Sequence, residues 1–365
     1  MNFCLVITNL SGGGAERAML DLAQALITSG HRVDLVLLEN FKLYDVPDNV
    51  AVHILQKRPG KSGHGWIAKR IIAIRFNYLW KKLNRQNHFD LTISRLPFCN
   101  EIVRLSRIPL AVYIIDNALS QEISRLNKSH GRFKAFKRLR RYKDLYENQN
   151  LVAVSRGVKQ DLCEILDTNC DLVSHIYNPI NVDLIRTMAA SKDMRLPEYR
   201  YVVHVARFNT QKRHDLLLDA WKEITSPHKL VLLTNSCTEL SRLVSDRGLE
   251  ERVYIAGFQK NPYPWIANAE LLVLTSDFEG FALVLVEAAI CGTPFISTNC
   301  KYGPSEIAIN YPDALVPCGD KQALSAAIVN KLARKKSPYT IDLGPYRFRG
   351  IASEYENLAA NLRSG

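Results

Sequence analysis

Residues 3–38 read FCLVITNLSGGGAERAMLDLAQALITSGHRVDLVLL, and the order of their patterns decides the fold. An apolar run at 3–8 predicts a buried strand, and a Gly-rich turn follows it. Helical periodicity then extends over about 15–29 and ends at Gly30, before a second apolar run at 33–38. Strand, helix and strand in this order form a βαβ unit with two parallel strands.

The same alternation continues through both halves of the chain. We expect further strands at 91–94, 112–115, 151–154, 201–206, 230–234, 253–256, 271–275 and 294–297, and further helices at about 215–221 and 283–291. The Asn-Pro pair at 178–179 interrupts the pattern. We therefore predict an α/β protein of two Rossmann-like, doubly wound domains, residues 1–177 and 178–345, with a final helix at about 346–365 that packs back on the first domain.

The composition is typical of a globular chain in a reducing compartment. Hydrophobic residues make up 47% and charged residues 23% of the chain, a balance that favours packed domains over disorder. No apolar run reaches the roughly 18 residues of a membrane-spanning helix, and the first residues lack the basic start of a signal peptide. The eight cysteines form no CxxC pair and no zinc-spaced cluster, so we expect reduced core thiols in a cytoplasmic protein.

The positive charge is concentrated in one stretch. The chain carries a net charge of +12, and residues 61–143 alone hold 19 Lys and Arg against four Asp and Glu. Residues 66–86 have helical periodicity, and residues 132–143 read as a basic amphipathic helix. Both segments indicate peripheral contact with an anionic membrane, and a solvated helix surface is the alternative. Nucleic acid is not an expected partner, because no nucleic-acid-binding module is recognised.

The stretch EGFALVLVE at 279–287 carries the clearest chemistry. Glu279 lies in a loop after a predicted strand, and Glu287 lies inside the following helix. The free backbone amides at the start of that helix are suited to bind a phosphate. The spacing alone also fits a second interpretation, in which both acids only favour the positive end of the helix.

Two cations five residues apart follow another predicted strand. Arg207 and Lys212 lie in the loop after 201–206, where they can bind a diphosphate and neutralise the charge of a leaving group. A solvated turn is the alternative. Because parallel sheets bind ligands at the carboxyl ends of their strands, we expect this loop and the Glu279 loop to share one wall of a cleft between the domains.

The Gly-rich turn in the first domain lets a ligand approach the backbone closely at Gly13 and Gly14. It is not a P-loop, because no Gly-Lys-Ser/Thr follows. It is not the dinucleotide fingerprint either, because Arg17 stands in the place of the last glycine. A plain tight turn between strand and helix is the alternative.

Together these motifs resemble the family-four retaining glycosyltransferases of the GT-B architecture, of the bacterial surface-polysaccharide type. Glu279 and Glu287 match the family's two glutamates separated by seven residues, and Arg207 and Lys212 match its Arg-x4-Lys pair. Further stretches that follow the family are 154–156, 177–179, 257–263 and 291–294. The resemblance is poor at 41–149, where acceptors usually bind in this family.

The resemblance implies a retaining, metal-independent transfer of a sugar from a nucleoside-diphosphate donor, with UDP as the expected nucleotide and no cofactor. The acceptor would be a glycan or lipid-linked glycan of cell-surface polysaccharide synthesis, such as lipopolysaccharide or capsule. The enzyme would be a hexosyltransferase or an N-acetylhexosaminyltransferase on the inner face of the cytoplasmic membrane. Its first domain would bind the acceptor, and its second domain would bind the nucleotide-sugar. A non-catalytic scaffold subunit of a polysaccharide assembly complex is the alternative.

The resemblance also implies roles for single residues. Glu279 would contact hydroxyls of the donor sugar and Glu287 the ribose, while Arg207 and Lys212 would stabilise the released diphosphate. The remaining implied donor-binding positions are loop residues and backbone amides: Gly13, Gly14, Gly257, Phe258, Gly280, Phe281, Ala282 and Leu283.

One position departs from the family pattern. The family often has a histidine after a strand of the first domain, and here Asp116 or Asn117 takes that place. A carboxylate at Asp116 would stabilise the cationic sugar in the transition state, so Asp116 joins Arg207, Lys212 and Glu279 as a candidate catalytic residue. An Asx turn is the alternative.

Overall fold

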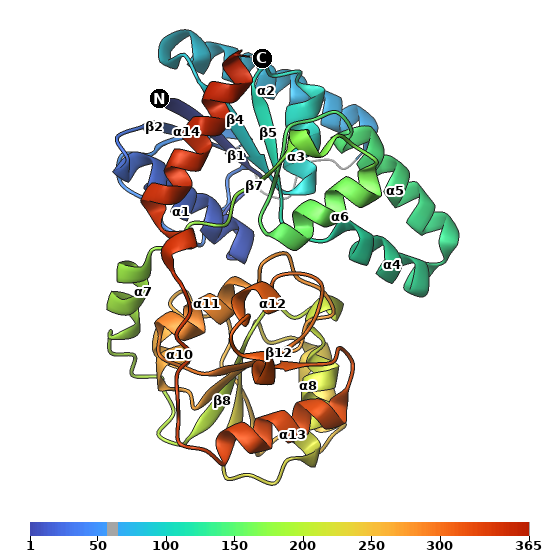
Figure 1. Cartoon of the computed structure of the whole chain (residues 1–365), viewed down its shortest axis with the longest axis vertical. Coiled ribbons are helices and arrows are strands. Elements are labelled where there is room, and N and C mark those ends of the chain that lie inside the picture. Colours follow the sequence, from blue (N-terminus) through green and yellow to red (C-terminus); the bar gives the residue numbers. More distant parts are fainter. Residues whose placement is uncertain (57–64, 365) are drawn as a thin grey trace. The chain divides into compact units, whose positions relative to one another are not determined.

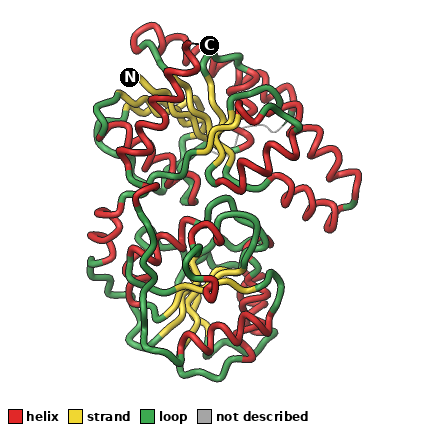
Figure 2. The backbone as a smooth tube through the Cα atoms, in the orientation of Figure 1, coloured by secondary structure: helices red, strands yellow, loops and turns green. Residues whose placement is uncertain are grey.

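The computed structural model describes residues 1–56 and 65–364, and the chain forms two compact α/β units. Unit 1 consists of Met1–Asn181 and Leu343–Gly365, and unit 2 consists of Val182–Asp342. Each unit has its own parallel sheet with helices packed around it (Figures 1 and 2). The predicted fold class, two Rossmann-like domains, is confirmed.

Unit 1 contains a seven-stranded parallel sheet in the order β3-β2-β1-β4-β5-β6-β7. Its strands are β1 (Asn2–Ile7), β2 (Arg32–Glu39), β3 (Ala51–Gln56), β4 (Leu91–Arg95), β5 (Ala111–Ile115), β6 (Leu151–Ala153) and β7 (Val173–His175). Its helices are α1 (Gly14–Thr28), α2 (Trp66–Asn87), α3 (Pro97–Leu105), α4 (Leu119–His130), α5 (Arg132–Tyr146), α6 (Arg156–Leu166) and α14 (Phe348–Ser364).

The order of strands in unit 1 reverses between β1 and β4. Strands β1 to β3 run toward one edge of the sheet, and β4 to β7 run toward the other. Because crossovers between parallel strands are right-handed, α1 covers one face, while α2, α3, α5 and α6 cover the opposite face. Strand β1 is covered on both sides, and its residues Phe3–Ile7 are fully buried.

The end of the chain completes unit 1. Helix α14 packs along α1 and buries Ile351, Ala352, Tyr355 and Ala359 (Figure 1). Just before it, the Tyr346 carbonyl accepts a hydrogen bond from the Ile180 N–H at 2.9 Å. Residues far apart in the sequence therefore form one packed layer of this unit.

Unit 2 contains a six-stranded parallel sheet in the order β10-β9-β8-β11-β12-β13. Its strands are β8 (Tyr201–Val205), β9 (Lys229–Leu233), β10 (Val253–Ile255), β11 (Leu271–Leu274), β12 (Phe295–Thr298) and β13 (Leu315–Val316). Its helices are α7 (Val182–Ala189), α8 (His214–Glu223), α9 (Thr238–Ser245), α10 (Tyr263–Asn268), α11 (Leu283–Ile290), α12 (Pro304–Ile307) and α13 (Lys321–Leu332). Its strand order reverses between β8 and β11.

The expectation of eight reduced core thiols is wrong in two respects. Cys163 and Cys170 form a disulfide, because α6 ends at Asp167 in a left-handed conformation and the chain returns to bring the two Cα atoms within 5.5 Å. Cys237 and Cys318 are exposed instead of buried. Within residues 1–56 and 65–364, no helix combines the length and the apolar character needed to cross a membrane.

Unit 2 contains two buried histidines that lie next to one another. His204 of β8 and His214 of α8 have ring centroids 4.7 Å apart, and both are almost inaccessible to solvent. Since a carbonyl only accepts, His204 Nδ1 carries the proton that is donated to the Val273 oxygen at 2.8 Å. Burial lowers the pKa of His204 to about 4 and that of His214 to about 2, so both rings are neutral at pH 7.

This pair makes the stability of unit 2 sensitive to acid. Below the unfolded-state pKa of about 6.5 the unfolded chain takes up protons that the folded rings reject, so stability falls as the pH drops. Between pH 6.5 and 4 we expect His204 alone to cost about 3 kcal/mol of unfolding free energy. His204→Asn keeps a donor near the position of Nδ1 and removes the titration. Urea unfolding across this pH range should show a correspondingly flatter curve for the variant.

The control is His88→Asn, at an exposed histidine with a left-handed backbone (φ 48°) that asparagine tolerates. It removes a histidine outside the buried pair, so it separates the effect of losing His204 from the effect of losing any one histidine. Parallel curves for His204→Asn and the wild type would contradict the prediction.

Candidate functional site

Arg207 and Lys212 lie on the loop that follows β8. Asn209 caps a single 3-10 turn, Thr210–Lys212, and its side-chain oxygen accepts a hydrogen bond from the Lys212 N–H at 3.0 Å. Arg207 is exposed, whereas the Lys212 side chain is largely covered and directed at Glu279. Arg207 thus lies at the surface before the turn, and Lys212 at its end reaches the neighbouring loop.

Glu279 is a buried carboxylate on the loop between β11 and α11. Its Oε1 lies 2.5 Å from Lys212 Nζ and also accepts a hydrogen bond from the Ser276 hydroxyl. Its backbone is fixed by the segment after β12, since the Glu279 N–H donates to Lys301 O at 3.1 Å and the Tyr302 N–H donates to Glu279 O at 2.8 Å. A carboxylate that is removed from water is stable only when it is paired in this way.

Further hydrogen bonds join the Lys212 loop to the Glu279 loop. Gln211 Nε2 donates to the Phe278 carbonyl at 2.7 Å, and the Asp277 N–H donates to the Gln211 carbonyl at 2.9 Å. Thr275 Oγ1 donates to the Lys212 carbonyl at 2.8 Å. The two loops, each predicted separately from sequence, are thus one connected structure at the reversal point of the sheet.

The turn into α11 has a demanding backbone. Ala282, the residue before the helix, adopts a left-handed conformation with φ 60°. Gly303, at φ 97°, packs against this turn so closely that a Cβ atom there would lie 2.7 Å from the Phe281 Cα and carbonyl carbon. Only glycine fits at this position, so Gly303 fixes the path of the backbone that leads into Leu283 and the free amides of the helix start.

Glu287 lies on α11 and is connected to α10. The Tyr263 hydroxyl, at the start of α10, lies 3.2 Å from Glu287 Oε1. Tyr263 itself follows the loop that contains Gly257 and Phe258, after β10. The Glu287 carboxylate therefore lies on the same side of the site as the loop that contains Gly257 and Phe258.

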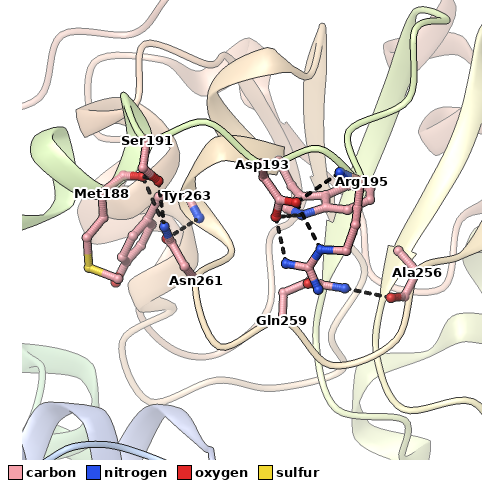
Figure 3. Close-up of polar contacts among 9 residues, drawn as sticks. Met188, Ser191, Asp193, Arg195, Ala256, Gln259, Asn261 and Tyr263 are labelled. Atoms are coloured by element: carbon pink, nitrogen blue, oxygen red, sulfur yellow. Dashed lines mark hydrogen bonds and ion pairs between the residues drawn. The ribbon is translucent and has the colours of Figure 1, made fainter.

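The loop after β10 is held by the last turn of α7 and by the connector from α7 to β8 (Figure 3). Asn261 Nδ2 donates to the Met188 carbonyl at 3.0 Å and to Ser191 Oγ at 3.1 Å. Trp265 Nε1 donates to Asp193 Oδ2 at 3.2 Å. These bonds lie within unit 2, and they fix the loop on which Gly257, with φ 79°, makes its turn.

Gly13 and Gly14 lie at the start of α1 in unit 1. Gly13 occupies the N-cap position, and its carbonyl accepts a hydrogen bond from the Arg17 N–H at 3.0 Å. Ser11 Oγ donates to Glu16 Oε1 at 2.9 Å and closes the turn. A Cβ atom added at Gly14 would meet no atom within 4 Å, so open space lies beside this glycine.

Asp116 follows β5 in unit 1 and is held by an arginine that the sequence analysis did not single out. Arg95, at the end of β4, is 1% exposed. Its Nε donates to Asp116 Oδ1 at 2.9 Å and to Oδ2 at 3.0 Å, and its Nη2 donates to Asn178 Oδ1 at 2.8 Å. The Asp116 carboxylate is therefore one half of an ion pair and not an isolated charge.

The sequence analysis missed residues that hold the candidate groups in place. Arg95, Ser276 and Gly303 fall into this class. A signal existed for Arg95, since a charged residue directly follows the predicted strand at 91–94, and the next predicted strand precedes Asp116. Among the residues described, no three or more His, Cys, Asp and Glu side chains are grouped so that they could hold a metal ion.

Two family models match the chain, one to each unit. The model for Glycosyltransferase Family 4 matches residues 12–184, and the model for Glycosyl transferases group 1 matches residues 199–334. The matched ranges include the Gly13 turn, Asp116 and the whole Lys212–Glu279 structure.

Curated relatives are glycosyltransferases. The N-acetylgalactosamine-N,N'-diacetylbacillosaminyl-diphospho-undecaprenol 4-alpha-N-acetylgalactosaminyltransferase of Campylobacter jejuni is 26% identical over 308 residues, which cover 83% of this chain and 82% of that protein. The lipopolysaccharide 1,6-galactosyltransferase of Salmonella typhimurium is 30% identical over 165 residues, which cover 43% of this chain and 44% of that protein.

Solved structures share the fold over almost the whole chain. Sucrose-phosphate synthase of Thermosynechococcus elongatus superposes with a TM-score of 0.72 at 18% identity, covering 99% of this chain and 94% of that protein. The HepE protein of Anabaena, in complex with UDP-glucose, superposes with a TM-score of 0.69 at 18% identity, covering 100% of this chain and 98% of that protein. The two matched models identify the chain as a glycosyltransferase, and its two Rossmann-like units have the GT-B architecture. Within that class, unit 1 matches the model for glycosyltransferase family four.

The close approach of Gly303 to Phe281 predicts a stability effect. Gly303→Ala introduces strain at positive φ, which costs about 1 kcal/mol, and an overlap with Phe281 backbone that costs a further 1–3 kcal/mol or so. Gly319→Ala is the matched control, because Gly319 has φ 76° but no atom within 4 Å of its Cβ position. Chemical unfolding should show the larger loss for Gly303→Ala, and equal losses would refute the steric argument.

The buried ion pair predicts strong coupling between Arg95 and Asp116. Arg95→Met should destabilise unit 1 by about 3–5 kcal/mol, because it leaves a poorly solvated carboxylate without its partner. The double variant Arg95→Met, Asp116→Leu removes both charges and should recover part of that loss. Urea unfolding of both single variants and the double variant measures the coupling. Losses that simply add would show that the pair has no such role.

Proposed function

We propose that this glycosyltransferase moves a sugar from a UDP-sugar to a lipid-linked glycan with retention of anomeric configuration and without a metal ion. The observation that carries the proposal is the contact of 2.5 Å between Lys212 Nζ and Glu279 Oε1. It joins the Lys212 loop after β8 to the Glu279 loop after β11, at the point where the strand order of unit 2 reverses. Doubly wound folds bind nucleotides at such points.

The cations of this site act on the leaving group. When the bond between sugar and diphosphate breaks, positive charge develops on the sugar and negative charge on the diphosphate. Arg207 and Lys212 neutralise the diphosphate, and the free amides at the start of α11 bind the phosphate nearer the sugar. Glu279 contacts sugar hydroxyls, and Glu287 contacts the ribose from its place beside Tyr263.

The reaction needs no nucleophile from the enzyme, because each bond that forms is matched by a bond that breaks. The acceptor hydroxyl oxygen forms a bond to the anomeric carbon on the face that the diphosphate leaves. The bond from that carbon to the diphosphate oxygen breaks, and the leaving phosphate takes the acceptor proton. The positive charge of two side chains replaces the charge that a metal ion supplies in other transferases.

Relatives and neighbours support the choice of substrates. The HepE structure contains UDP-glucose, and the Campylobacter jejuni relative is named for an acceptor on diphospho-undecaprenol. We therefore assign this chain a UDP-hexose or UDP-N-acetylhexosamine donor and a polyprenyl-diphosphate-linked glycan acceptor. Lipopolysaccharide and capsule are the polysaccharides to which such an intermediate leads.

An acceptor of this kind is anchored in the membrane. The basic segments 66–86 and 132–143 belong to unit 1, which we assign to acceptor binding. Their charge suits peripheral contact with anionic lipid on the cytoplasmic face.

The donor proposal is tested by thermal shift with nucleoside diphosphates and nucleotide-sugars, with and without EDTA. UDP at about 100 times its dissociation constant should stabilise the protein by about 2.7 kcal/mol. The shift should persist in EDTA and vanish in Arg207→Ala. Arg242→Ala is the matched control, since Arg242 is an exposed arginine on α9 of the same unit.

Turnover tests the catalytic part. Arg207→Ala should lower the rate of sugar transfer about 100-fold, because a fixed charge on the leaving group is lost. Proton NMR of the product gives the anomeric configuration, and inversion would refute the mechanism. A protein that no nucleoside diphosphate stabilises would instead point to a scaffold subunit.

A further inference from the structure

Helix α2 has two opposite apolar faces, of which only one is covered by the protein. The covered face consists of Lys69, Ile72, Ala73, Phe76, Trp80, Leu83 and Asn87. The opposite face carries Ile67, Ile71, Ile74 and Tyr78, spaced by four, three and four residues so that they form one stripe. Ile74 is 70% exposed and Tyr78 is 76% exposed. A helix on the surface of a globular domain normally carries polar residues there.

Cations border this outer stripe, and no acidic residue occurs in the helix. Arg70, Arg75, Lys81, Lys82 and Arg85 are exposed. In helical projection they lie beside the stripe or continue it at its C-terminal end. Trp66 begins the helix at 66% exposure, and the Arg70 guanidinium lies 4.2 Å from its ring centroid. An apolar stripe with cationic borders and an aromatic end is the pattern of helices that lie in the interface of an anionic bilayer.

Helix α5 repeats the pattern on the same side of the sheet. Phe133 is 79% exposed and Phe136 is 63% exposed, opposite a buried face that includes Tyr142. Right-handed crossovers place α2, α3 and α5 in one layer, so their outer faces point away from the same face of the sheet.

A partly buried carboxylate connects the two helices. Glu101 on α3 accepts from Lys69 Nζ of α2 at 2.9 Å on both oxygens, and it also pairs with Arg141 of α5. The cation on the covered side of α2 is therefore used inside the protein, and the outer cations are left for a partner. Because Glu101 joins α2 to α5, the exposed apolar residues of both helices belong to one connected layer.

We propose that α2 is a monotopic membrane anchor, whose outer stripe inserts among the acyl chains of an anionic bilayer while its bordering cations bind lipid phosphates. The inference deepens the proposed function, because it turns surface contact into insertion and names the residues that enter the lipid. Helix α5 adds Phe133 and Phe136 as a second point of insertion. The protein would lie in the interface and not cross it.

Tryptophan fluorescence distinguishes insertion from adsorption. The chain has four tryptophans, of which Trp80, Trp221 and Trp265 are buried and only Trp66 is exposed. With vesicles of phosphatidylglycerol and phosphatidylethanolamine, the emission of Trp66 should shift to the blue and be quenched by brominated acyl chains. Trp66→Phe should abolish both signals. Vesicle binding without quenching would overturn insertion and leave adsorption by charge.

Vesicle flotation tests the stripe itself. Ile74→Ser, Tyr78→Ser should weaken binding to the same vesicles at least tenfold, and Lys81→Gln, Lys82→Gln should weaken it about fivefold per charge. Ile309→Ser is the matched control, because Ile309 is 77% exposed but belongs to unit 2. Equal binding of wild type and the Ile74, Tyr78 variant would overturn the proposal. So would a stable dimer that this variant dissociates, since the stripe would then be an interface between copies.

The failure of this inference is separable from failure of the proposed reaction. Arg207→Ala should bind vesicles like the wild type although it transfers little sugar. The Ile74, Tyr78 variant should retain turnover on an acceptor glycan with a short, water-soluble lipid and lose it on a full-length lipid acceptor in vesicles. Loss of both activities alike would count against an anchor.

Discussion

The contact between Lys212 and Glu279 connects two loops that come from opposite sides of the reversal point in the second sheet. Neither side chain is stable there alone, because a buried carboxylate needs a cation and a largely covered lysine needs an acceptor. The bonds of Gln211, Asp277 and Thr275 then hold the two backbones at the spacing that this pair requires. The direction of the helix that follows, and with it the position of Glu287, depends on the same loop.

The first unit uses a different solution to a similar problem. Arg95 joins the ends of β4 and β5 and reaches Asn178, at the point where the chain leaves this unit. If Asp116 takes part in transfer, it does so as a carboxylate whose charge is shared with a buried guanidinium. That arrangement favours a role in fixing the geometry of the strand ends over a role as an isolated negative charge beside the sugar.

Much of this structure could be predicted from the sequence, because long buried strands leave a clear pattern. The expected strands at 201–206 and 271–275, for example, agree with β8 and β11 to within a residue. The missed strands β3, β7 and β13 all lie at sheet edges and are only partly buried, so they leave a weak apolar pattern. The site residues were found where a motif encodes them. Gly303 and Ser276 were not, because their importance comes from contacts across the fold. The double-faced nature of α2 was also hidden, since periodicity indicates a helix but not which of two apolar faces is covered.

The return of the last helix to the first unit has a consequence for the newly made chain. Unit 2 is continuous in sequence, so the ribosome releases all of it before the residues of α14 appear. Until then α1 lacks its cover of Ile351, Tyr355 and Ala359, and an apolar helix surface stays open to water. The half of the protein synthesised first is therefore the half that is finished last.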